Sequence, residues 1–446
     1  MTQQYKYLHF IDYILFQRWD VKAYAFQQKV FKNAVLLREI LTPYNVPLSK
    51  EKMIDKGWSI IAKINFAGEL FLRAPENTKT FKGNVHEIDG ETLIYSKINV
   101  RHGCVYYHPK DSIHFGVSSE YPAYKIDNKR VNGDFLVLLL QSQYFKNALS
   151  AGTSGISKAR VKPNVFLDIQ IPLPSLEEQN KIIAAYNATI AQAKQYSTQA
   201  KDIDKQIEKY LQEILGLGIQ LKTNSKTSNS FLRLYKFSET RNRWDLNKVR
   251  NSHKGNYEFV CLSDVVSKMS TGTTPPTRNK EYFNGDIDFY TPADIGRNMY
   301  LGDAERYISQ IAIRDNKARC FYKGDLLFVG IGSTVGKVGL VNKEMVSSNQ
   351  QITGITFNTQ KILPEYAFIY MHYFKENTTA NQSKTTLPIV NQGKIAKIPL
   401  PLPPINVQNE IVEHITAWRK KQKDLQQKSL TLRQQATQQF EQIIFA

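Results

Sequence analysis

Cysteine, acidic residues and long apolar runs are all scarce in this sequence, and each scarcity excludes a class of protein. The three cysteines, Cys104, Cys261 and Cys320, are too few for the disulfide framework of a small secreted domain. No apolar run reaches the roughly 18 residues that a membrane-spanning helix needs. The N-terminal stretch is polar and interrupted by Asp12, which makes it a poor signal peptide. We therefore expect a reduced protein of the cytoplasm.

Acidic side chains are outnumbered by basic ones, with 40 Asp and Glu against 59 Lys and Arg, so the formal net charge is +19. The sequence pI is about 9.5. This excess favours a polyanionic partner, either nucleic acid or an acidic membrane surface. A hydrophobic content of 42%, with 24 Tyr and 23 Phe, indicates folded rather than disordered protein. The length of 446 residues suits two to four domains.

One short motif occurs twice. Residues 171–183 read IPLPSLEEQNKII, and residues 400–412 read LPLPPINVQNEIV. Pro-Leu-Pro is followed in both by a branched apolar residue and then by Gln-Asn. Gln179 therefore corresponds to Gln408, at an offset of 229 residues (408 − 179).

The repeat extends upstream of this motif. The tripeptide RWD stands at 18–20 and again at 243–245, an offset of 225 residues (243 − 18). At the same offset, VLLREIL (35–41) aligns without a gap with VCLSDVV (260–266). One register that joins separated matches predicts two copies of one unit, arranged with pseudo-two-fold symmetry.

Each copy has the same internal order. A basic, strand-rich part comes first, then a short helix, then Pro-Leu-Pro, which suits the entry to a further helix rather than its interior. We expect strands where β-branched and aromatic residues are bounded by Gly, Asn and Asp, namely in 91–100, 104–108, 286–291 and 324–332. The short helices are expected in 133–149 and 364–374.

A long helix is predicted at the end of each copy, over about 175–217 and about 406–444. The apolar or small residues of the first are spaced by three and four, with one irregular step: Ile183, Tyr186, Ile190, Ala193, Tyr196, Ala200, Ile203, Ile207, Tyr210 and Ile214. Those of the second are Ile411, Ile415, Trp418, Leu425, Leu432, Ala436, Phe440 and Ile443, with Gln422 and Ser429 as interruptions. Neither helix can bury this stripe alone, so we expect the two to pair antiparallel.

The expected fold class is α+β, with two pseudo-symmetric mixed α/β domains separated by two long antiparallel coiled-coil helices. The predicted boundaries are a first domain at 1–172, a central helix at 173–220, a linker at 221–232, a second domain at 233–402 and a C-terminal helix at 403–446. Two similar basic domains at a fixed separation suit a bipartite site on duplex DNA, where phosphate contacts give affinity and loops read base edges.

The chain resembles the specificity (S) subunits of type I restriction-modification systems. The resemblance covers nearly the whole length and depends on the two joint motifs and on four stretches of the second domain: LSDVVSKMSTGTTPP, GDIDFYTPADI, GSTVGKVGLV and SSNQQITGI. In the first copy ETLIYSKINVRHG and VSSEYPAY fit, whereas the TGTTPP loop has no counterpart.

This resemblance implies a DNA-reading subunit without catalytic residues. Each target recognition domain would read one half of a bipartite DNA target, and the helices would set the spacer and dock two methyltransferase (M) subunits. Restriction (R) subunits would join in the full complex. No cofactor is expected on this chain itself. S-adenosylmethionine is expected in the partner methyltransferase, and ATP and magnesium are expected in the partner restriction subunit.

Three motifs suggest other chemistry, and in each the residues present argue against it. FVGIG (328–332) fits a methyltransferase cofactor turn, but the sequence lacks the Asn/Asp-Pro-Pro-aromatic loop that grips a target adenine. GIGSTVGK lacks the spacing of a phosphate loop. HGCVYYH would place His102, Cys104, Tyr106 and His108 on one face of a strand, but no second cluster completes a zinc site.

Candidate DNA contacts are basic, amide and hydroxyl residues in the basic domains. In the first copy they are Lys97, Asn99 and Arg101, expected to alternate along a strand, with Ser119, Tyr121, Lys158 and Arg160. In the second copy they are Thr273, Thr274, Arg278, Asp294, Arg297, Ser333, Thr334, Lys337, Asn349, Gln350, Gln351 and Lys384. The amides of 349–351 have the groups that pair bidentately with adenine. The candidate residues for the helix joints and the partner interface are Leu176, Gln179, Ile183, Ile405, Gln408 and Ile411.

Two other functions remain open from the residues alone. A fused, stand-alone restriction-modification enzyme would need nuclease and methyltransferase domains, for which the two units leave no room. A coiled-coil scaffold that binds DNA non-specifically would show no sequence preference.

Overall fold

The computed structural model describes residues 31, 33–74, 81–151, 160–217, 255–296, 298–379 and 388–445. The two RWD tripeptides and the predicted linker at 221–232 lie outside these residues. The chain divides into two compact units: unit 1 comprises Met1–Tyr196 and Gln427–Ala446, and unit 2 comprises Ser197–Gln426. Among the described helices, none combines the length and the hydropathy that crossing a bilayer would need.

Unit 1 is a mixed α/β domain. Its strands are β1 (Ala34–Leu36), β2 (Leu41–Tyr44), β3 (Val46–Pro47), β4 (Ile61–Ile64), β5 (Leu70–Leu72), β6 (His86–Ile88), β7 (Thr92–Tyr95), β8 (Val105–His108), β9 (Phe115–Val117), β10 (Ala123–Ile126) and β11 (Gln170–Pro172). Its helices are the 3-10 turns η2 (Leu37–Glu39) and η3 (Val100–His102), and α2 (Lys50–Asp55), α4 (Gly133–Gln141), α5 (Gln143–Ala151) and α6 (Pro163–Leu167). The sheets have the orders β2-β10-β7-β8, β3-β6-β9, β1-β11 and β4-β5.

Unit 2 repeats this plan. Its strands are β12 (Phe259–Cys261), β13 (Val266–Thr271), β14 (Ile287–Tyr290), β15 (Tyr307–Ile308), β16 (Cys320–Tyr322), β17 (Leu326–Val329), β18 (Val338–Leu340), β19 (Met345–Ser348), β20 (Ile352–Phe357) and β21 (Pro399–Pro401). Its helices are the 3-10 turns η5 (Leu262–Asp264) and η6 (Lys280–Phe283), and α9 (Gln310–Arg314), α10 (Pro364–Tyr373), α11 (Lys375–Thr379) and α12 (Gln392–Ile395). The sheets have the orders β13-β20-β17-β18, β15-β14-β19-β16 and β12-β21.

The internal repeat of the sequence is visible in the topology. The antiparallel sheet β2-β10-β7-β8 corresponds to β13-β20-β17-β18, and the pair β1-β11 to β12-β21. The shared acidic residue of the aligned heptapeptides caps the same 3-10 turn in both. The N–H of Leu36 donates to Glu39 at 2.8 Å, and the N–H of Cys261 donates to Asp264 at 2.9 Å. The predicted fold class is confirmed.

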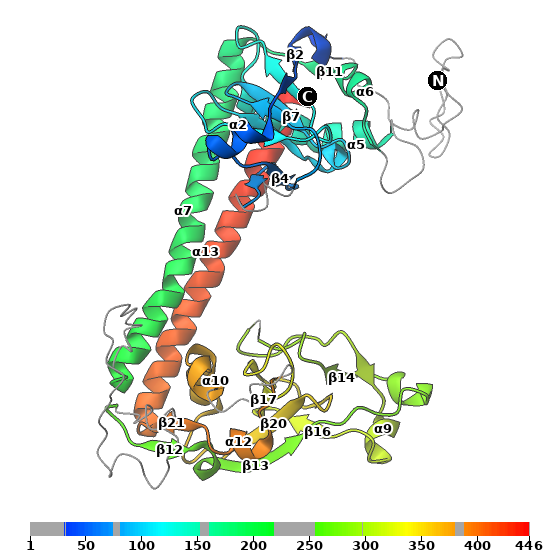
Figure 1. Ribbon diagram of the computed structural model, residues 1–446. Coiled ribbons are helices and arrows are strands. Elements are labelled where there is room, and N and C mark those ends of the chain that lie inside the picture. The colour runs from blue at the N-terminus through cyan, green and yellow to red at the C-terminus, as the bar shows by residue number, and fades with distance from the viewer. Residues whose placement is uncertain are drawn as a thin grey trace, which may run out of the picture. The chain divides into compact units, whose positions relative to one another are not determined.

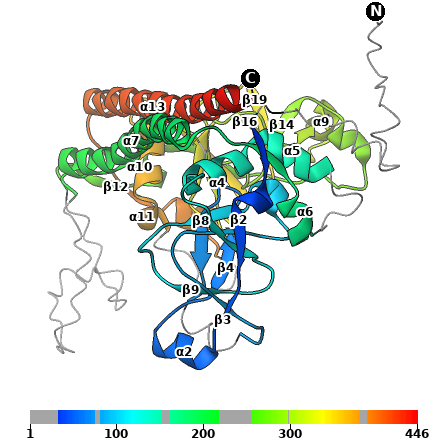
Figure 2. The ribbon, with the colours of Figure 1, turned by 90° about the horizontal axis from the view of Figure 1, so that it is seen from above.

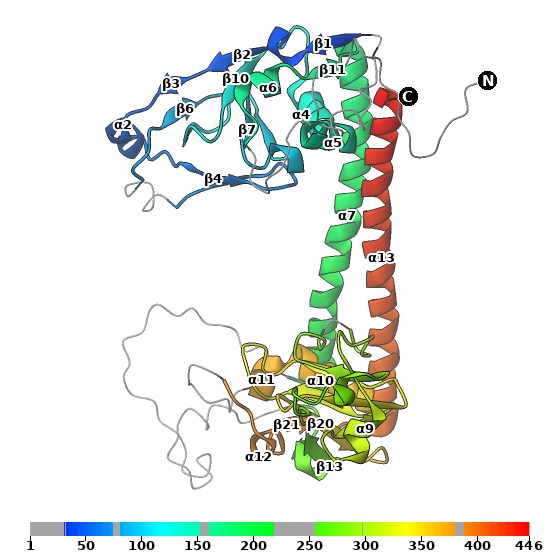
Figure 3. The same ribbon diagram turned by 90° about the vertical axis from the view of Figure 1, so that its right-hand side faces the viewer.

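The core of unit 1 includes side chains from both long helices, α7 (Leu176–Leu215) and α13 (Ile405–Phe445). Ile183 of α7 and Phe440 of α13 are buried in the same apolar cluster as Phe135 of α4. The rings of Phe135 and Phe440 are 5.9 Å apart. Within unit 1, α4 and α5 lie next to the helices, whereas α2 and β3 lie at the end away from them (Figures 2 and 3).

The repeated glutamine explains why the joint motif occurs twice. In unit 1 the Nε2 of Gln179 donates to the carbonyls of Arg130 and Pro174, at 2.9 and 2.8 Å, and its Oε1 accepts from the N–H of Asn132 at 2.8 Å. Gln179 is 0% exposed. The side chain therefore ties the first turn of α7 to the backbone that enters α4.

Gln408 makes the equivalent three hydrogen bonds in unit 2. Its Nε2 donates to the carbonyls of Lys361 and Pro403, at 3.1 and 2.8 Å, and its Oε1 accepts from the N–H of Leu363 at 2.8 Å. Gln408 is also 0% exposed. All its partners are backbone atoms, so the same joint can serve domains of different sequence.

The long helices match the predicted lengths, with 40 residues in α7 and 41 in α13. They lie side by side and antiparallel (Figure 1). The buried positions of α7 are Gln179, Ile183, Ala193, Ala200, Ile203, Ile207, Leu211 and Leu215. Those of α13 are Gln408, Ile411, Ile415, Gln422, Leu425, Ser429, Ala436 and Phe440. Ile443 of the predicted stripe is 64% exposed, and Leu211 and Leu215, which the prediction did not include, are buried. Seven of the predicted residues are half-buried: Tyr186, Ile190, Tyr196, Tyr210, Ile214, Trp418 and Leu432.

The sequence predicted that Gln422 and Ser429 interrupt the packing of α13. In the structure both residues are part of that packing. Each is 6% exposed. Ser429 Oγ donates to the carbonyl of Ala193 at 2.7 Å, within unit 1, and Gln422 Nε2 donates to the carbonyl of Ala200 at 2.9 Å, within unit 2. Because the small side chain of alanine leaves the carbonyl accessible, a polar residue can stay buried at a position that the apolar pattern alone reads as a break.

A polar cluster attaches α10 to the helix pair in unit 2. The guanidinium of Arg419 on α13 lies 3.2 Å from Nε2 of His372 and 5.3 Å from the ring centre of Tyr373. It also donates to Gln422 at 3.2 Å and lies 3.7 Å from Asp204 of α7. Burial, and then the charge of Arg419, lower the pKa of His372 to about 4.

We expect this histidine to make unit 2 less stable in mild acid. The pKa in the folded state lies below the ordinary value of 6.5, so the unfolded chain binds the proton first. Stability is therefore lost as pH falls from about 6.5 towards 4, by about 2 kcal/mol between pH 7 and pH 4.5. His372→Gln keeps an acceptor for Arg419 without a titrating group. Urea unfolding at both pH values should show the smaller loss in the variant; equal losses would contradict this role.

Candidate nucleic-acid interface

Segments from distant parts of unit 2 meet at one edge of its sheets. They are the β17–β18 turn, the β19–β20 turn, the end of β13, the loop after β14 and the segment before α12. Backbone hydrogen bonds of 2.8 to 3.1 Å join them: Gly330 N to Gln351 O, Val390 N to Gly330 O, Thr273 N to Ser348 O, and Asn349 N to Tyr290 O. The β17–β18 turn contains the GIGSTVGK motif, residues 330–337.

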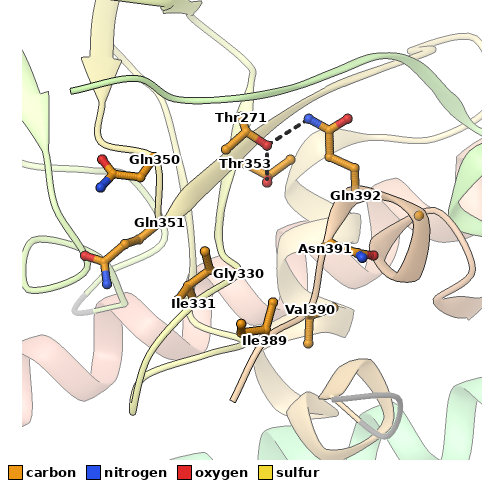
Figure 4. A pocket seen from close by; sticks show the side chains of 11 residues that line it. Thr271, Gly330, Ile331, Gln350, Gln351, Thr353, Ile389, Val390, Asn391 and Gln392 are labelled. Atoms are coloured by element: carbon orange, nitrogen blue, oxygen red, sulfur yellow. Dashed lines mark hydrogen bonds between the residues drawn. The ribbon is translucent and has the colours of Figure 1, made fainter. Parts of the chain in front are cut away.

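Two pockets open among these segments. Pocket A has a volume of about 390 Å³ and is lined by Thr271, Gly330, Ile331, Gln350, Gln351, Thr353, Ile389, Val390, Asn391, Gln392 and Gly393 (Figure 4). Pocket B has a volume of about 340 Å³ and is lined by Thr291, Pro292, Ala293, Arg306, Ile331, Gly332, Ser333, Thr334, Asn349 and Gln351. Ile331 and Gln351 line both, so the two pockets adjoin.

Amides and hydroxyls provide the polar groups of pockets A and B, and Arg306 is the one charged residue among the lining residues. In pocket A, Nε2 of Gln392 donates to Thr271 Oγ1 at 2.8 Å, and the hydroxyls of Thr271 and Thr353 are 3.2 Å apart (Figure 4). At the rim the hydroxyl of Thr274 donates to Oε1 of Gln350. Neutral donors and acceptors of this kind can pair with the edges of bases.

The structure gathers five predicted contact residues of unit 2 around these pockets: Ser333, Thr334, Asn349, Gln350 and Gln351. Asp294 uses its carboxylate inside the protein, where it accepts from the N–H and the hydroxyl of Thr291 at 2.8 Å. Arg278 is exposed and does not line either pocket. DNA contact stays a prediction for all of these residues. Arg297, Lys384 and Lys158 lie outside the described residues.

Lys337, at the end of the β17–β18 turn, interacts electrostatically with a second lysine, Lys375, which was not among the predicted contact residues. Burial, and then the charge of Lys337, lower the pKa of Lys375 on α11. The two ammonium groups are thus close enough to repel each other.

In unit 1 a third pocket, C, brings three predicted residues together. It has a volume of about 340 Å³, and its lining includes Lys97, Ser119 and Tyr121. Residues that the sequence did not single out complete it: Pro43, Tyr44, Asn45, His86, Val117, Ser118, Pro122, Ala123, Tyr124, Pro163, Asn164 and Leu167. Arg160 contacts Glu120, which stands between Ser119 and Tyr121 in the sequence. The Nε of Arg160 lies 3.2 Å from the Glu120 carboxylate.

The predicted strand over Lys97, Asn99 and Arg101 is wrong. Strand β7 ends at Tyr95, and the chain then turns: the N–H of Val100 donates to the carbonyl of Ser96 at 2.9 Å, and η3 follows. Gly103, with a φ of 90°, ends that turn. The three side chains therefore do not alternate on one face, and Lys97 alone of them lines pocket C.

The same turn corrects the placement of HGCVYYH. His102 lies in η3, and the strand β8 begins at Val105, so His102 and Cys104 are not on a strand face with Tyr106 and His108. Tyr106 and His108 do share a face, with 3.4 Å between the hydroxyl and Nδ1. Within the described ranges, no three His, Cys, Asp or Glu side chains are grouped so that they could hold a metal ion.

The joint residues are placed as helix contacts within their own units. Gln179 and Ile183 are buried in unit 1, and Gln408 and Ile411 in unit 2. Leu176 and Ile405, the first residues of α7 and α13, are half-buried. A contact of any of these residues with a partner subunit stays a prediction.

Sequence reasoning missed Thr271, Arg306, Thr353, Asn391 and Gln392. They come from four separate segments. Thr271 and Thr353 lie within the stretches LSDVVSKMSTGTTPP and SSNQQITGI, but Arg306, Asn391 and Gln392 belong to no motif that the sequence singled out. Their common feature is a three-dimensional one, the closing of the β17–β18 turn on the segment around Val390. The isolated bridge between Ile331 and Ile389 is part of this closure.

Comparison with known proteins gives one family. Residues 254–432 match the family model of the type I restriction modification DNA specificity domain. The chain is 24% identical over 198 residues to the type I restriction enzyme MjaIX specificity subunit of Methanocaldococcus jannaschii, covering 42% of this chain and 41% of the relative. It is 21% identical over 301 residues to the EcoDI specificity subunit of Escherichia coli, covering 66% and 64%. The chain thus spans less than two thirds of either relative.

A solved structure supports the fold over most of the chain. It is described by the words "complex assembly and conformational transition of the type I R-M system", and one of its chains superposes with a TM-score of 0.59 at 16% identity. The match covers 94% of this chain and 98% of that one. At this identity the likeness concerns the fold alone.

Proposed function

We propose that this chain, whose residues 254–432 match the type I restriction modification DNA specificity domain, is the DNA-reading subunit of such a system. Unit 1 and unit 2 each read one half of a bipartite duplex target. This chain has no catalytic role in the proposal; methyl transfer and cleavage are the work of partner subunits.

The observation that carries this proposal is the pair of adjoining pockets A and B. A protein of net charge +19 is expected to hold phosphates through its basic residues. Among the residues that line pockets A and B, however, Arg306 is the only charged one. A sequence-specific DNA-binding protein must also contact the edges of bases. Amides and hydroxyls held at the edge of a sheet are suited to that contact.

The partners follow from the same proposal. Two methyltransferase subunits would dock on the helices and joints, and restriction subunits would join them in the full complex. S-adenosylmethionine would be bound by the methyltransferase, and ATP and magnesium by the restriction subunit. The length of the helix pair would set the number of unspecified base pairs between the half-sites. The expected compartment is the cytoplasm.

Exchanging the domain of unit 2 tests this function. Residues 259–401, from β12 through β21, are replaced by the equivalent domain of a relative with a different target. Because Gln408 contacts backbone atoms alone, the joint should accept the new domain. Methylation mapping of the complex reconstituted with methyltransferase subunits should show one half of the target changed and the other intact.

The control is this chain alone with S-adenosylmethionine, which should methylate no DNA. Methylation by the isolated chain, or a change in both half-sites, would contradict the proposal. Equal binding of all duplex sequences would instead favour the non-specific scaffold.

A further inference from the structure

The orientation of one amide in the pockets is determined by a backbone group. The N–H of Gln351 lies 3.1 Å from a side-chain terminal atom of Asn349. A backbone N–H can only donate, so this atom of Asn349 is the oxygen, Oδ1. The other terminal atom is therefore Nδ2, which can only donate.

This second group fixes the next side chain. Nδ2 of Asn349 lies 3.0 Å from a terminal atom of Gln351, which must accept and is therefore Oε1. Both ends of the Asn349 amide are thus used inside the protein, and one side of the Gln351 amide is used as well. Of the four terminal atoms of these two amides, Nε2 of Gln351 is the one that makes no hydrogen bond within the described part of the chain, so both of its N–H donors remain for a ligand.

The pocket leaves this nitrogen open. Gly332, at the β17–β18 turn, has a φ of 111°, and a Cβ on it would lie 3.6 Å from Nε2 of Gln351 with no other atom within 4 Å. A side chain at this position would cover the amide. Gln351 lines both pocket A and pocket B, so its side chain lies where the two pockets adjoin.

We propose that Gln351 is a specificity-determining residue of unit 2 and that it donates to the keto oxygen of a base, O6 of guanine or O4 of thymine. This inference rests on the proposed function. It differs from the adenine pairing that the sequence suggested, because adenine and cytosine present an amino group at the corresponding place in the major groove. The Nε2 donors of Gln351 pair with a keto oxygen and cannot pair with those amino groups.

Two substitutions should reverse the preference by different routes. In Gln351→Glu, one carboxylate oxygen still accepts from Asn349, and the other turns an acceptor towards the base. In Asn349→Asp, the N–H of Gln351 still has its acceptor, but the carboxylate cannot donate to Oε1. The Gln351 amide should then rotate, donate Nε2 to Asp, and present Oε1 to the base.

The experiment is selection from a random duplex library by the full complex with its methyltransferase subunits. Both variants should replace the same single base pair of the unit 2 half-site by one with an amino group where the keto oxygen stood. The preference at that pair should change on the order of ten-fold. The half-site of unit 1 should stay as it is, which reports an intact complex.

A matched control exists at the other end of β20. The N–H of Gln360 donates to Oδ1 of Asn358 at 3.1 Å, the same local contact as that between Gln351 and Asn349. Asn358→Asp makes the same chemical change outside both pockets, and it should leave both half-sites unchanged.

Gln351→Met is the variant to use if the complexes with the charged variants do not bind DNA. It keeps the length of the side chain without its donors, and it should relax that one base pair to all four. An unaltered half-site in Gln351→Met, or different base pairs altered by Gln351→Glu and Asn349→Asp, would overturn the inference while the proposed function stands. Failure of the unsubstituted complex to select any bipartite sequence would remove both.

Discussion

Gln408→Ala is expected to destabilise unit 2 by about 3 kcal/mol and to leave unit 1 unaffected. The substitution removes one acceptor and two donated hydrogen bonds at a residue that is 0% exposed. It leaves the N–H of Leu363 and the carbonyls of Lys361 and Pro403 without their partner. A buried polar group without a partner costs about 1–3 kcal/mol, so even partial rescue by water leaves a large loss.

Amide hydrogen exchange of the native chain measures this effect unit by unit. In Gln408→Ala the amides of α10 should exchange on the order of a hundred-fold faster, since about 1.4 kcal/mol corresponds to ten-fold in the opening equilibrium. Those of α4 should keep their rates. Gln179→Ala should give the reverse result, and Asn409→Ala, at an exposed neighbouring position, should change neither. Equal acceleration in α4 and α10 would show that the two joints do not act separately.

These glutamines show what a sequence repeat can and cannot reveal. The recurrence of Gln-Asn after Pro-Leu-Pro predicted a joint, because one unit must enter a long helix in the same way twice. It did not predict the partners. Arg130 and Lys361 contribute carbonyl oxygens, so their identity as residues carries no signal of the contact.

The long helices were predictable for a different reason. A stripe spaced by three and four over some forty residues leaves no competing structure, so α7 and α13 begin and end close to the predicted residues. The errors occurred where burial depends on a specific partner. Gln422 and Ser429 break the apolar pattern, yet each finds a carbonyl of the opposite helix.

The candidate site was the least predictable part. The prediction of a strand over residues 97–101 was wrong, because a local turn at Ser96 and the left-handed conformation of Gly103 outweigh the alternating pattern. Pocket A assembles from segments more than a hundred residues apart, from Thr271 to Gly393, and pocket B from segments up to 60 residues apart (351 − 291). The neutral chemistry of Asn349, Gln350 and Gln351 was visible in the sequence. The direction in which the Gln351 amide points was not, because it depends on one backbone N–H.

Two buried hydrogen bonds between α7 and α13 indicate where the helix pair can be lengthened. Ala193 accepts from Ser429 within unit 1, and Ala200 accepts from Gln422 within unit 2. Insertions after Tyr196 in α7 and after Gln426 in α13 fall between them on both helices. Each unit then keeps its own hydrogen bond and its own apolar contacts.

Four helix-forming residues inserted at both positions should lengthen the spacer of the target by about two base pairs. They add about 6 Å of helix, and a base pair occupies about 3.4 Å along the duplex. Rotation favours four residues over seven. Four residues turn a helix about 40° beyond a full turn, and two base pairs turn the duplex by about 70°, so the mismatch is about 30°. Seven residues would leave the helix about 20° short of two full turns, whereas the matching three base pairs turn the duplex by about 105°. The rotational mismatch would then be about 125°.

Methylation mapping by the reconstituted complex measures the spacer directly, and both half-sites should be unchanged. The matched control carries the insertion in α7 alone. It moves Ala193 or Ala200 by about 6 Å relative to α13, so one of the two buried hydrogen bonds is lost, and we expect methylation to be lost with it. An active double-insertion complex with the original spacer would mean that the helix pair does not separate the two reading domains. A longer spacer with the half-sites preserved would establish that α7 and α13 together measure the distance between them.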